Sequence, residues 1–375
     1  MKSLRRFIIP LLLIAPIAVA QAAEPYTAAI VLDPVTGKTL YEKNPNEPRP
    51  IASMTKMMTL LVVLDQIEAG NISWDTPVEV SAKASRMGGS QVYLKHREVF
   101  PVEDLVAATM VHSANDAAMA LAETVAGTER GFVRMMNEKA EELGLENTSF
   151  NSPHGLPAEG SDEEDVMSPR DLAIVGWELM KSDRMRRLAA TQTMPFRDGE
   201  FTMYNPNHLI RDYPLATGIK TGYHDRAGFC VTASAKKGEM ELVAVVMGSK
   251  NKRDNFGSAE ELFQRAFSSY ERIEPVQAGK SLPKTVRVLE GEEDTVPVVA
   301  ARSVPMTVPR GERPDIDVVI ESSSAAAPIS KSQQVGWIIV RQEGKPVAKV
   351  PALAARPVER ASWLARLWAK IWPFD

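Results

Sequence analysis

GFCVTASAKKGEMELVAVVMGS, residues 228–249, is the segment from which the fold class of this chain follows. Two runs of apolar and β-branched residues, FCVTASA and MELVAVVMG, flank a Lys-Lys-Gly turn signal, which predicts an antiparallel hairpin. A second hairpin is predicted nearer the N-terminus, where the apolar runs 26–32 and 39–42 flank the turn formers of residues 33–37.

The segments between the two hairpins are mainly helical in pattern. Apolar residues recur at helical spacing in residues 54–67, MTKMMTLLVVLDQI, and further helices are predicted at 102–125, 130–143 and 258–270. Residues 149–166 are rich in Pro, Gly and acidic side chains and predict a long loop. Because helices and strands are segregated along the chain, we expect an α+β domain in which helices cover an antiparallel sheet.

The chain of 375 residues is long enough for two domains. Beyond residue 274 it changes to short Val-rich runs separated by Pro, Gly and Ser, which predicts a small all-β domain. The strands expected there cover residues 285–289, 295–300, 316–321 and 335–341. We therefore divide the chain into an α+β domain at 24–275 and a small β domain at 276–352, with distinct segments at 1–23 and 353–375.

The N-terminal segment has the pattern of a cleaved secretory signal. Basic residues within the first six positions precede the apolar run 7–20, and Ala20-Gln21-Ala22 resembles a signal peptidase site. An uncleaved membrane anchor is the alternative, but the run is short for a span and contains two prolines. The segment predicts export.

The C-terminal segment 353–375 predicts an amphipathic helix, with residues 357–375 reading PVERASWLARLWAKIWPFD. Its apolar residues fall on one helical face: Trp363, Leu364, Leu367, Trp368, Ile371 and Trp372. Trp and cationic side chains suit the headgroup zone of a membrane, so the helix is predicted to bind a membrane surface. A helix docked on the protein's own surface remains the alternative.

Composition excludes several classes of function. The formal net charge of -4, with 25% charged residues, argues against nucleic acid as the main partner. Cys230 is the only cysteine, so the chain can form neither an internal disulfide nor a cysteine cluster for zinc. We predict no metal and no cofactor.

Three short motifs carry the predicted chemistry: Ser53-Met-Thr-Lys56, Ser113-Ala-Asn115 and Lys220-Thr221-Gly222. Alone, each is weak, because helix caps and strand-entry turns give the same patterns. Together they are informative. The first opens a buried helix, the second interrupts an apolar helical region, and the third precedes the hairpin at 228–249.

A serine hydroxyl needs a nearby base to act as a nucleophile, and Lys56 lies one helical turn after Ser53 on the same face. That lysine must be neutral to accept a proton, and burial together with the second cation Lys220 would lower its pKa. The N–H groups of Ser53 and Tyr223 would stabilise a developing oxyanion. The residues therefore predict serine acyl transfer.

This set of motifs resembles that of the penicilloyl serine transferases. Within that superfamily the chain is most similar to the low-molecular-mass D-alanyl-D-alanine carboxypeptidases of the peptidase S11 type, over roughly residues 25–375. Three short segments are also similar to those of this subfamily: 52–56 (ASMTK), 154–156 (HGL) and 218–222 (GIKTG). The resemblance implies a β-lactamase/transpeptidase-like fold, a small β domain and a C-terminal anchor.

The resemblance also implies a role for each site residue. Ser53 would attack the penultimate D-alanine carbonyl of a peptidoglycan stem pentapeptide, with Lys56 as general base. Ser113 would pass a proton to the leaving D-alanine, assisted by Lys220. The implied substrate-binding residues are Asn115, Thr221, Gly222, Tyr223 and Arg253, although the Lys-rich segment that contains Arg253 equally fits a solvated loop.

The partners implied are the peptidoglycan stem peptide, β-lactam antibiotics and the membrane surface, and the place implied is the periplasmic face of the inner membrane. Three alternatives remain. A class A β-lactamase would need a deacylating glutamate in the 149–166 loop, where Glu159, Glu163 and Glu164 are candidates without that enzyme's local pattern. The others are a non-catalytic membrane-tethered binding protein and an endopeptidase acting on crosslinked wall.

Overall fold

The computed structural model describes residues 24–157, 163–322 and 324–371, so the predicted signal segment lies outside the described residues. At the centre of the first domain is a five-stranded sheet of order β10-β11-β12-β1-β2. Every neighbouring pair in it is antiparallel. The strands are β1 (Ala28–Asp33), β2 (Lys38–Lys43), β10 (Ala216–His224), β11 (Gly228–Lys237) and β12 (Met240–Ser249).

Both faces of this sheet are buried, which explains the unbroken apolar run of β12. Val243, Val245 and Met247 belong to one hydrophobic core, while Leu242, Ala244 and Val246 belong to another on the opposite face. Successive side chains of a strand point to opposite faces, so a strand covered on both sides must be apolar at every position.

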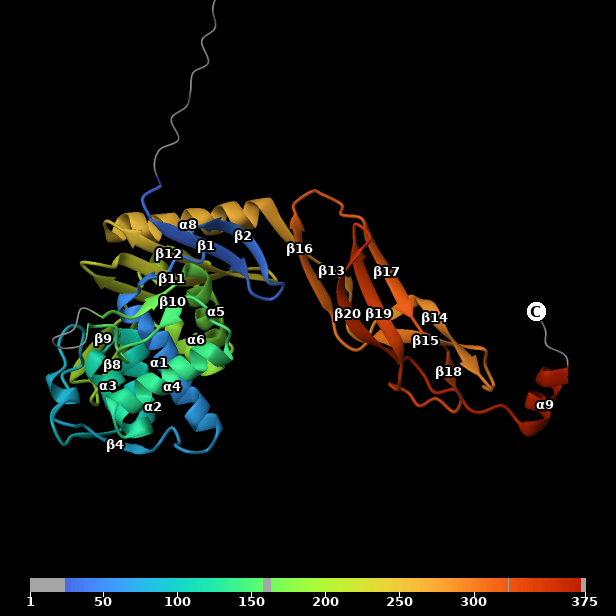
Figure 1. Cartoon of the computed structure of the whole chain (residues 1–375), viewed down its shortest axis with the longest axis horizontal. Helices are drawn as coiled ribbons and strands as arrows, with labels where there is room; N and C mark the ends of the chain where they lie inside the picture. The colour runs from blue at the N-terminus through green and yellow to red at the C-terminus, as the bar shows by residue number, and fades with distance from the viewer. Residues whose placement is uncertain (1–23, 158–162, 323, 372–375) are drawn as a thin grey trace, which may run out of the picture.

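Figure 1 shows α8 along one face of the sheet and α1 to α6 gathered on the far side, while Leu209 of α7 packs in the same core as α8. The helices are α1 (Lys56–Glu68), α2 (Val102–Ala107), α3 (Asn115–Ala126), α4 (Glu129–Glu142), α5 (Pro169–Met180), α6 (Asp183–Ala190), α7 (Leu209–Asp212) and α8 (Lys252–Ser269). Short strands complete the domain: β3 (Arg49–Pro50), β4 (Pro77–Glu79), β5 (Val99–Pro101), β6 (Thr148–Ser149), β7 (Val166–Met167), β8 (Thr193–Phe196) and β9 (Phe201–Tyr204). The predicted α+β fold, an antiparallel sheet covered by helices, is confirmed.

Two helices differ from their predicted course. The helix expected at 102–125 is broken. After α2 the chain forms a π-helical turn at Ala108–His112, and Ser113 then takes a left-handed conformation with φ 63° before α3 begins. The helix expected at 258–270 begins six residues earlier, because the Asn251 side chain accepts a hydrogen bond from the Asp254 N–H at 2.9 Å and caps it. Its first turns are polar, so they lack the apolar period used for the prediction.

The second domain is all-β, as predicted. Its sheets have the orders β13-β16 and β17-β19-β20-β15-β14-β18 around one apolar core. The strands are β13 (Tyr270–Val276), β14 (Ser281–Leu289), β15 (Thr295–Ala300), β16 (Val304–Pro309), β17 (Ile316–Glu321), β18 (Ala325–Ala326), β19 (Gln334–Gln342) and β20 (Lys345–Ala354). The sequence prediction omitted β13, β16 and β20, each of which contains proline, a residue that counts against strand assignment.

A buried ion pair lies where the two domains meet. Arg272 of β13 donates to Asp33 Oδ2 at 2.5 Å, and the Thr307 hydroxyl of β16 bonds to the same oxygen. The Asp33 side chain is fully buried and that of Arg272 is 10% exposed. Asp33 also accepts the backbone N–H of Val35 at 3.0 Å, which fixes the β1–β2 turn. This one carboxylate therefore joins the end of β1 to the β domain.

The β domain extends away from the first domain, and α9 (Trp363–Ile371) lies at its far end (Figure 1). Arg366 of α9 contacts Glu290 Oε2 at 3.2 Å. Trp363, Leu364 and Leu367 are 67%, 51% and 49% exposed. Among the described residues, no helix has the length and apolar character needed to cross a bilayer.

Candidate active site

A groove of about 520 Å³ contains residues from all three sequence motifs. Ser53, Ser113, Asn115, Thr221, Gly222 and Tyr223 all line it, although they come from the start of α1, the α2–α3 break and β10. The sheet edge and the helical side of the domain thus bring together residues that are far apart in the sequence.

Ser53 and Lys56 are placed by a helical turn at Ala52–Thr55 that leads directly into α1. Ala52 has the left-handed φ of 48°, which is uncommon for alanine and typical of strained functional segments. The Lys56 side chain is completely buried, and its Nζ lies 3.0 Å from Ser53 Oγ. Lys56 Nζ also donates to the His154 carbonyl oxygen at 2.6 Å. A buried amine therefore touches the hydroxyl.

Both motif lysines have perturbed pKa values. Burial lowers the pKa of Lys56 well below its usual value, and the positive charge of Lys220 lowers it further, against the opposing effects of Asp165 and Asp116. Burial alone lowers the pKa of Lys220 to about 7. Both amines are buried, and the charge of Lys220 acts on Lys56. The lowered pKa makes Lys56 easier to deprotonate than an exposed lysine, as a general base requires.

The second motif presents polar atoms to the groove. Ser113 Oγ and Asn115 Oδ1 are buried, as is Lys220 Nζ, and none of the three has a hydrogen-bond partner among the described residues. The Asn115 amide is oriented by its Nδ2, which donates to the Gly88 carbonyl at 2.7 Å. Asn115 Oδ1 therefore remains as an acceptor, and it suits a substrate N–H.

Two glycines allow backbone segments to pack against the nucleophile. A Cβ on Gly222 would lie 2.4 Å from the Ile51 carbonyl oxygen, so β10 approaches the Ser53 turn as closely as a glycine permits. A Cβ on Gly155, which has φ +88°, would lie 2.1 Å from the Ala52 oxygen and 2.9 Å from the Ser53 nitrogen. The Ser53 turn is held between β10 and the loop that contains Gly155.

Arg253, a predicted substrate-binding residue, is not among the residues that line the groove, whereas its neighbour Lys252 is. The early start of α8 places Lys252 at its first position. Sequence reasoning also missed several lining residues: Leu156, His112, Tyr204, Phe229 and Phe256. Position beside a candidate residue was an available signal for two of the missed residues, because His112 precedes Ser113 and Lys252 precedes Arg253. The aromatic residues had no such signal.

The acidic loop candidates lie elsewhere. Glu164 faces Arg226 Nε at 3.3 Å and His224 Nε2 at 3.8 Å, and neither Glu163 nor Glu164 lines the groove. Glu159 lies outside the described residues. The described part of the loop therefore brings no glutamate to the lining of the groove.

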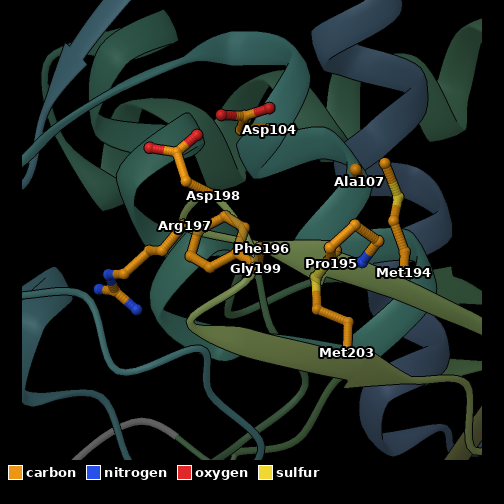
Figure 2. A pocket seen from close by; sticks show the side chains of 9 residues that line it. All are labelled: Asp104, Ala107, Met194, Pro195, Phe196, Arg197, Asp198, Gly199 and Met203. Carbon is orange, nitrogen blue, oxygen red and sulfur yellow. The ribbon is translucent and has the colours of Figure 1, made fainter.

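A second pocket of about 360 Å³ lies between α2 and the β8–β9 hairpin (Figure 2). Asp104 and Asp198 face it, and Arg197 lies beside them. Arg197 is held by Glu98 at 2.7 Å and by the Val92 carbonyl at 2.6 Å. The described lining residues include no serine, lysine or histidine, so this pocket lacks the acyl-transfer groups found in the groove.

Comparison with known proteins agrees with this geometry. Residues 17–251 match the protein family described as D-alanyl-D-alanine carboxypeptidase. The chain belongs to the D-alanyl-D-alanine carboxypeptidase family. Residues 270–360 match a second family, described as penicillin-binding protein 5, C-terminal domain. The match between the chain and the first family confirms the resemblance inferred from the motifs.

A relative and two solved structures illustrate the family. D-alanyl-D-alanine carboxypeptidase DacF of Bacillus subtilis (strain 168) is 34% identical over 353 residues, covering 93% of this chain and 90% of the relative. The structure of a peptidoglycan synthesis regulatory factor (PBP3) from Streptococcus pneumoniae has a TM-score of 0.80 and 28% identity, covering 90% of this chain and 100% of that one. Penicillin-binding protein D2 from Listeria monocytogenes in its ampicillin-bound form has a TM-score of 0.60 and 27% identity, covering 66% of this chain and 99% of that one.

Proposed function

We propose that this chain is a serine-type D-Ala-D-Ala carboxypeptidase that removes the terminal D-alanine from peptidoglycan stem pentapeptides through an acyl-enzyme on Ser53. The observation that carries the proposal is the 3.0 Å contact between Ser53 Oγ and the fully buried Lys56 Nζ. An amine whose pKa is lowered by burial and by a second lysine can accept the hydroxyl proton more readily than a solvent-exposed lysine can.

In the acylation step, Lys56 Nζ takes the Ser53 hydroxyl proton while Oγ forms a bond to the penultimate D-alanine carbonyl carbon. The carbonyl oxygen becomes an oxyanion, which the N–H groups of Ser53 and Tyr223 would stabilise. The close packing of Gly222 against Ile51 supports this role, because it brings the β10 backbone next to the Ser53 turn.

Collapse of the tetrahedral intermediate breaks the C–N bond to the terminal D-alanine. Ser113, assisted by Lys220, passes its hydroxyl proton to the departing amine and regains a proton from the protonated Lys56, so Lys56 is neutral again and the leaving group carries the proton taken from Ser53. Asn115 Oδ1 accepts a substrate N–H. Thr221 and Lys220 bind the terminal carboxylate, and Lys252 is better placed than Arg253 to add a positive charge, because it lines the groove.

Hydrolysis of the ester completes the cycle. Water attacks the acyl carbon, Lys56 again accepts the proton, and Ser53 Oγ leaves as the hydroxyl when that proton returns to it. A β-lactam would acylate Ser53 by the same first step. Its ring amide carbon bonds to Oγ and its ring nitrogen takes the proton, but the nitrogen remains tethered in the site.

The direct test is release of D-alanine from a stem pentapeptide by the wild type, Ser53→Ala and Lys56→Ala. We expect both variants to lose nearly all turnover while keeping their fold. Normal turnover by Ser53→Ala would rule out the acyl-enzyme. Hydrolysis of benzylpenicillin much faster than that of the pentapeptide would instead favour a β-lactamase.

We further propose that the enzyme is exported and acts at the periplasmic face of the inner membrane, to which α9 binds. The exposed apolar side chains Trp363, Leu364 and Leu367 support this placement, since such a surface gains free energy when it enters the headgroup zone. Arg366 binds Glu290 of the β domain, so the helix is anchored to the β domain through its charged side.

Vesicles of phosphatidylglycerol and phosphatidylethanolamine test the membrane proposal. Replacing Trp363, Leu364 and Leu367 by serine should abolish most co-sedimentation, because each buried apolar side chain contributes about 1.5 to 3 kcal/mol. Trp337→Ser, which removes a part-exposed tryptophan from the β domain, is the matched control and should bind as the wild type does. Equal binding by the triple variant would refute a role for α9.

A further inference from the structure

The His154 carbonyl is the second contact of the Lys56 amine, and its geometry bears on catalysis. Lys56 Nζ donates to it at 2.6 Å, a shorter distance than the 3.0 Å to Ser53 Oγ. A neutral amine has two N–H bonds and one lone pair. Fixing one N–H on a carbonyl restricts where the lone pair can point.

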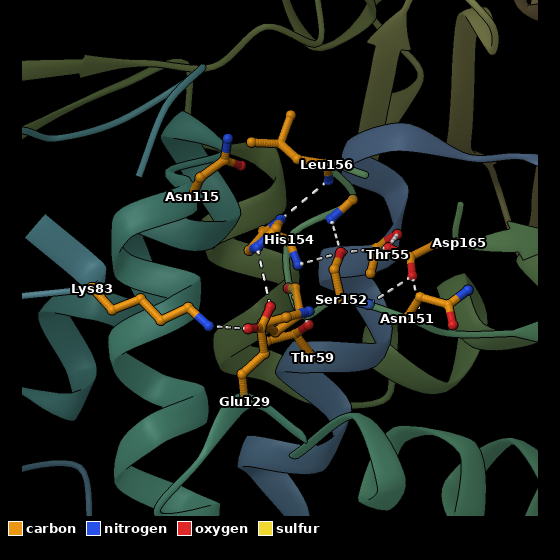
Figure 3. A network of polar contacts seen from close by, with 12 residues as sticks. Thr55, Thr59, Lys83, Asn115, Glu129, Asn151, Ser152, His154, Leu156 and Asp165 are labelled. Carbon is orange, nitrogen blue, oxygen red and sulfur yellow. Dashed lines mark hydrogen bonds and ion pairs between the residues drawn. The ribbon is translucent and has the colours of Figure 1, made fainter. Parts of the chain in front are cut away.

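The His154 ring is held from two sides in a buried setting (Figure 3). Its Nδ1 accepts the Leu156 N–H at 3.1 Å, so the ring proton of the neutral form lies on Nε2. Nε2 faces Glu129 Oε1 at 3.6 Å. The other oxygen of Glu129, the first residue of α4, is paired with Lys83. These contacts fix the ring and, through it, the His154 peptide.

The charge states agree with this arrangement. The contact with His154, followed by that with Lys83, lowers the pKa of Glu129 to about 2 against the effect of burial. Burial lowers the pKa of His154, with Lys56 adding to this effect and Glu129 opposing it. At neutral pH the Nε2–H of a neutral imidazole therefore faces the Glu129 carboxylate across 3.6 Å, and the Leu156 N–H on Nδ1 sets this tautomer.

We propose that Glu129 and His154 are positioning residues for the acyl-transfer reaction: they hold the His154 carbonyl on one N–H of Lys56 and thereby aim the amine lone pair at Ser53 Oγ. The inference rests on the function proposed above. It assigns a role in the reaction to a carboxylate that does not line the groove and belongs to none of the three motifs.

The rest of the loop is attached independently of Glu129. Thr59 donates to the Pro153 carbonyl at 2.6 Å, and the Ser152 hydroxyl donates to Asp165 at 2.7 Å. Loss of the Glu129 contact should therefore loosen the His154 peptide without releasing the loop. The charged groups that shift the pKa of Lys56 are Lys220, Asp165 and Asp116, so Glu129 acts through geometry.

Acylation by benzylpenicillin, measured by stopped flow from pH 5 to pH 10, tests the proposal. The variants are Glu129→Leu, which removes the acceptor, and Glu129→Gln, which keeps an acceptor without the charge. Glu138→Leu is the control, because Glu138 lies on the same helix in an exposed pair with Arg134. Thermal unfolding of each variant is measured in parallel.

We expect Glu129→Leu to slow the limiting acylation step about 10-fold with little change in penicillin affinity, since a small misplacement of a reacting group is costly. The acidic limb of its profile should move to lower pH, because a carbonyl stabilises the ammonium form more than the amine, and losing it lowers the pKa of Lys56 further. Glu129→Gln and Glu138→Leu should stay within about threefold of the wild type on the same reasoning.

His154→Asn is the second variant and decides the case if Glu129→Leu does not fold. Asn Oδ1 can still accept the Leu156 N–H, but the contact with Glu129 is lost, so acylation should slow by a similar factor. Wild-type rates and pH profile in a folded Glu129→Leu or His154→Asn protein would overturn the proposal. Absence of acylation in the wild type would instead refute the proposed function.

Discussion

The burial of Lys56 and Lys220 serves catalysis but lowers the stability of the folded protein. Each amine is fully buried, and Lys220 Nζ has no hydrogen-bond partner among the described residues. In the unfolded chain each amine is protonated and hydrated. Folding must either bury that charge or remove the proton, and both cost free energy. The site is therefore expected to be a region where replacement stabilises the protein and abolishes its activity.

Lys220→Met should raise the free energy of unfolding by about 5 kcal/mol at pH 6. The sign follows from a folded-state pKa of about 7, below the unfolded value of 10.5. The penalty of burying Lys220 is complete below pH 7 and disappears as the pH rises toward 10.5. The difference between variant and wild type, measured by urea unfolding, should shrink over that interval.

Lys237→Met, at an exposed position of the same sheet, is the control and should change stability little at either pH. A Lys220→Met protein less stable than the wild type at pH 6 would show that other interactions stabilise the buried Lys220 ammonium. Whether Lys220→Met is more or less stable, its carboxypeptidase turnover should be strongly reduced.

The site depends on three backbone segments that meet at Ser53: the turn at Ala52–Thr55, the strand β10 and the loop that contains Gly155. None of them bears the reactive groups alone. Their spacing is set by glycines, because only a residue without Cβ allows the observed approach of Gly155 to the Ala52 carbonyl. The packing of these segments, as well as the motif side chains, defines the nucleophile's geometry.

Gly155→Ala should therefore impair both stability and acylation. The new Cβ would lie 2.1 Å from the Ala52 oxygen, and the turn or the loop must move. Gly127→Ala is the matched control, since Gly127 has φ +71° but a Cβ at that position would meet no atom within 4 Å. We expect the control to lose about 1 kcal/mol with a normal acylation rate.

Penicillin acylation and thermal unfolding of both glycine variants separate the two effects. If Gly155→Ala acylated as fast as Gly127→Ala, the loop would have no part in placing Ser53. A loss of acylation in both would point to strain at positive φ rather than to the contact with Ala52.

The sequence was sufficient for β1, β2, β11 and β12 of the main sheet and for the motif residues, because apolar period and local spacing carry that information. It did not predict β10, the strand that contains Lys220, Thr221 and Gly222. Ser53 and Lys56 are one helical turn apart, so their contact could be expected. The contact between Glu129 and His154 could not, since the two lie in different segments and neither has a distinguishing neighbour. Lys252 was missed by one position, because the polar first turns of α8 hide where that helix begins.

The two domains are joined by few specific polar contacts, and Asp33 is central among those described. Its carboxylate receives Arg272 and Thr307 from the β domain while it caps the β1–β2 turn of the first domain. Because α9 lies at the far end of the β domain, this junction sets where the groove stands relative to any membrane that α9 binds (Figure 1).

Asp33→Ala should destabilise the protein by about 3 kcal/mol, since it leaves the Arg272 guanidinium buried without its partner. Glu321→Ala, which breaks an exposed pair with Lys349 in the β domain, should cost far less, because water and salt screen that pair. Thermal or urea unfolding compares the two. An equally small loss of stability in both variants would mean that the Asp33 junction makes no specific contribution to the free energy of unfolding.

The whole account depends on Ser53 being the residue that becomes acylated. Intact-protein and peptide mass spectrometry after brief exposure to benzylpenicillin tests this directly in the wild type, Ser53→Ala and Lys56→Ala. We predict one adduct on the peptide that contains Ser53, none in Ser53→Ala, and greatly slowed formation in Lys56→Ala. An adduct on another residue of the wild type, or labelling of Ser53→Ala at the wild-type rate, would contradict it.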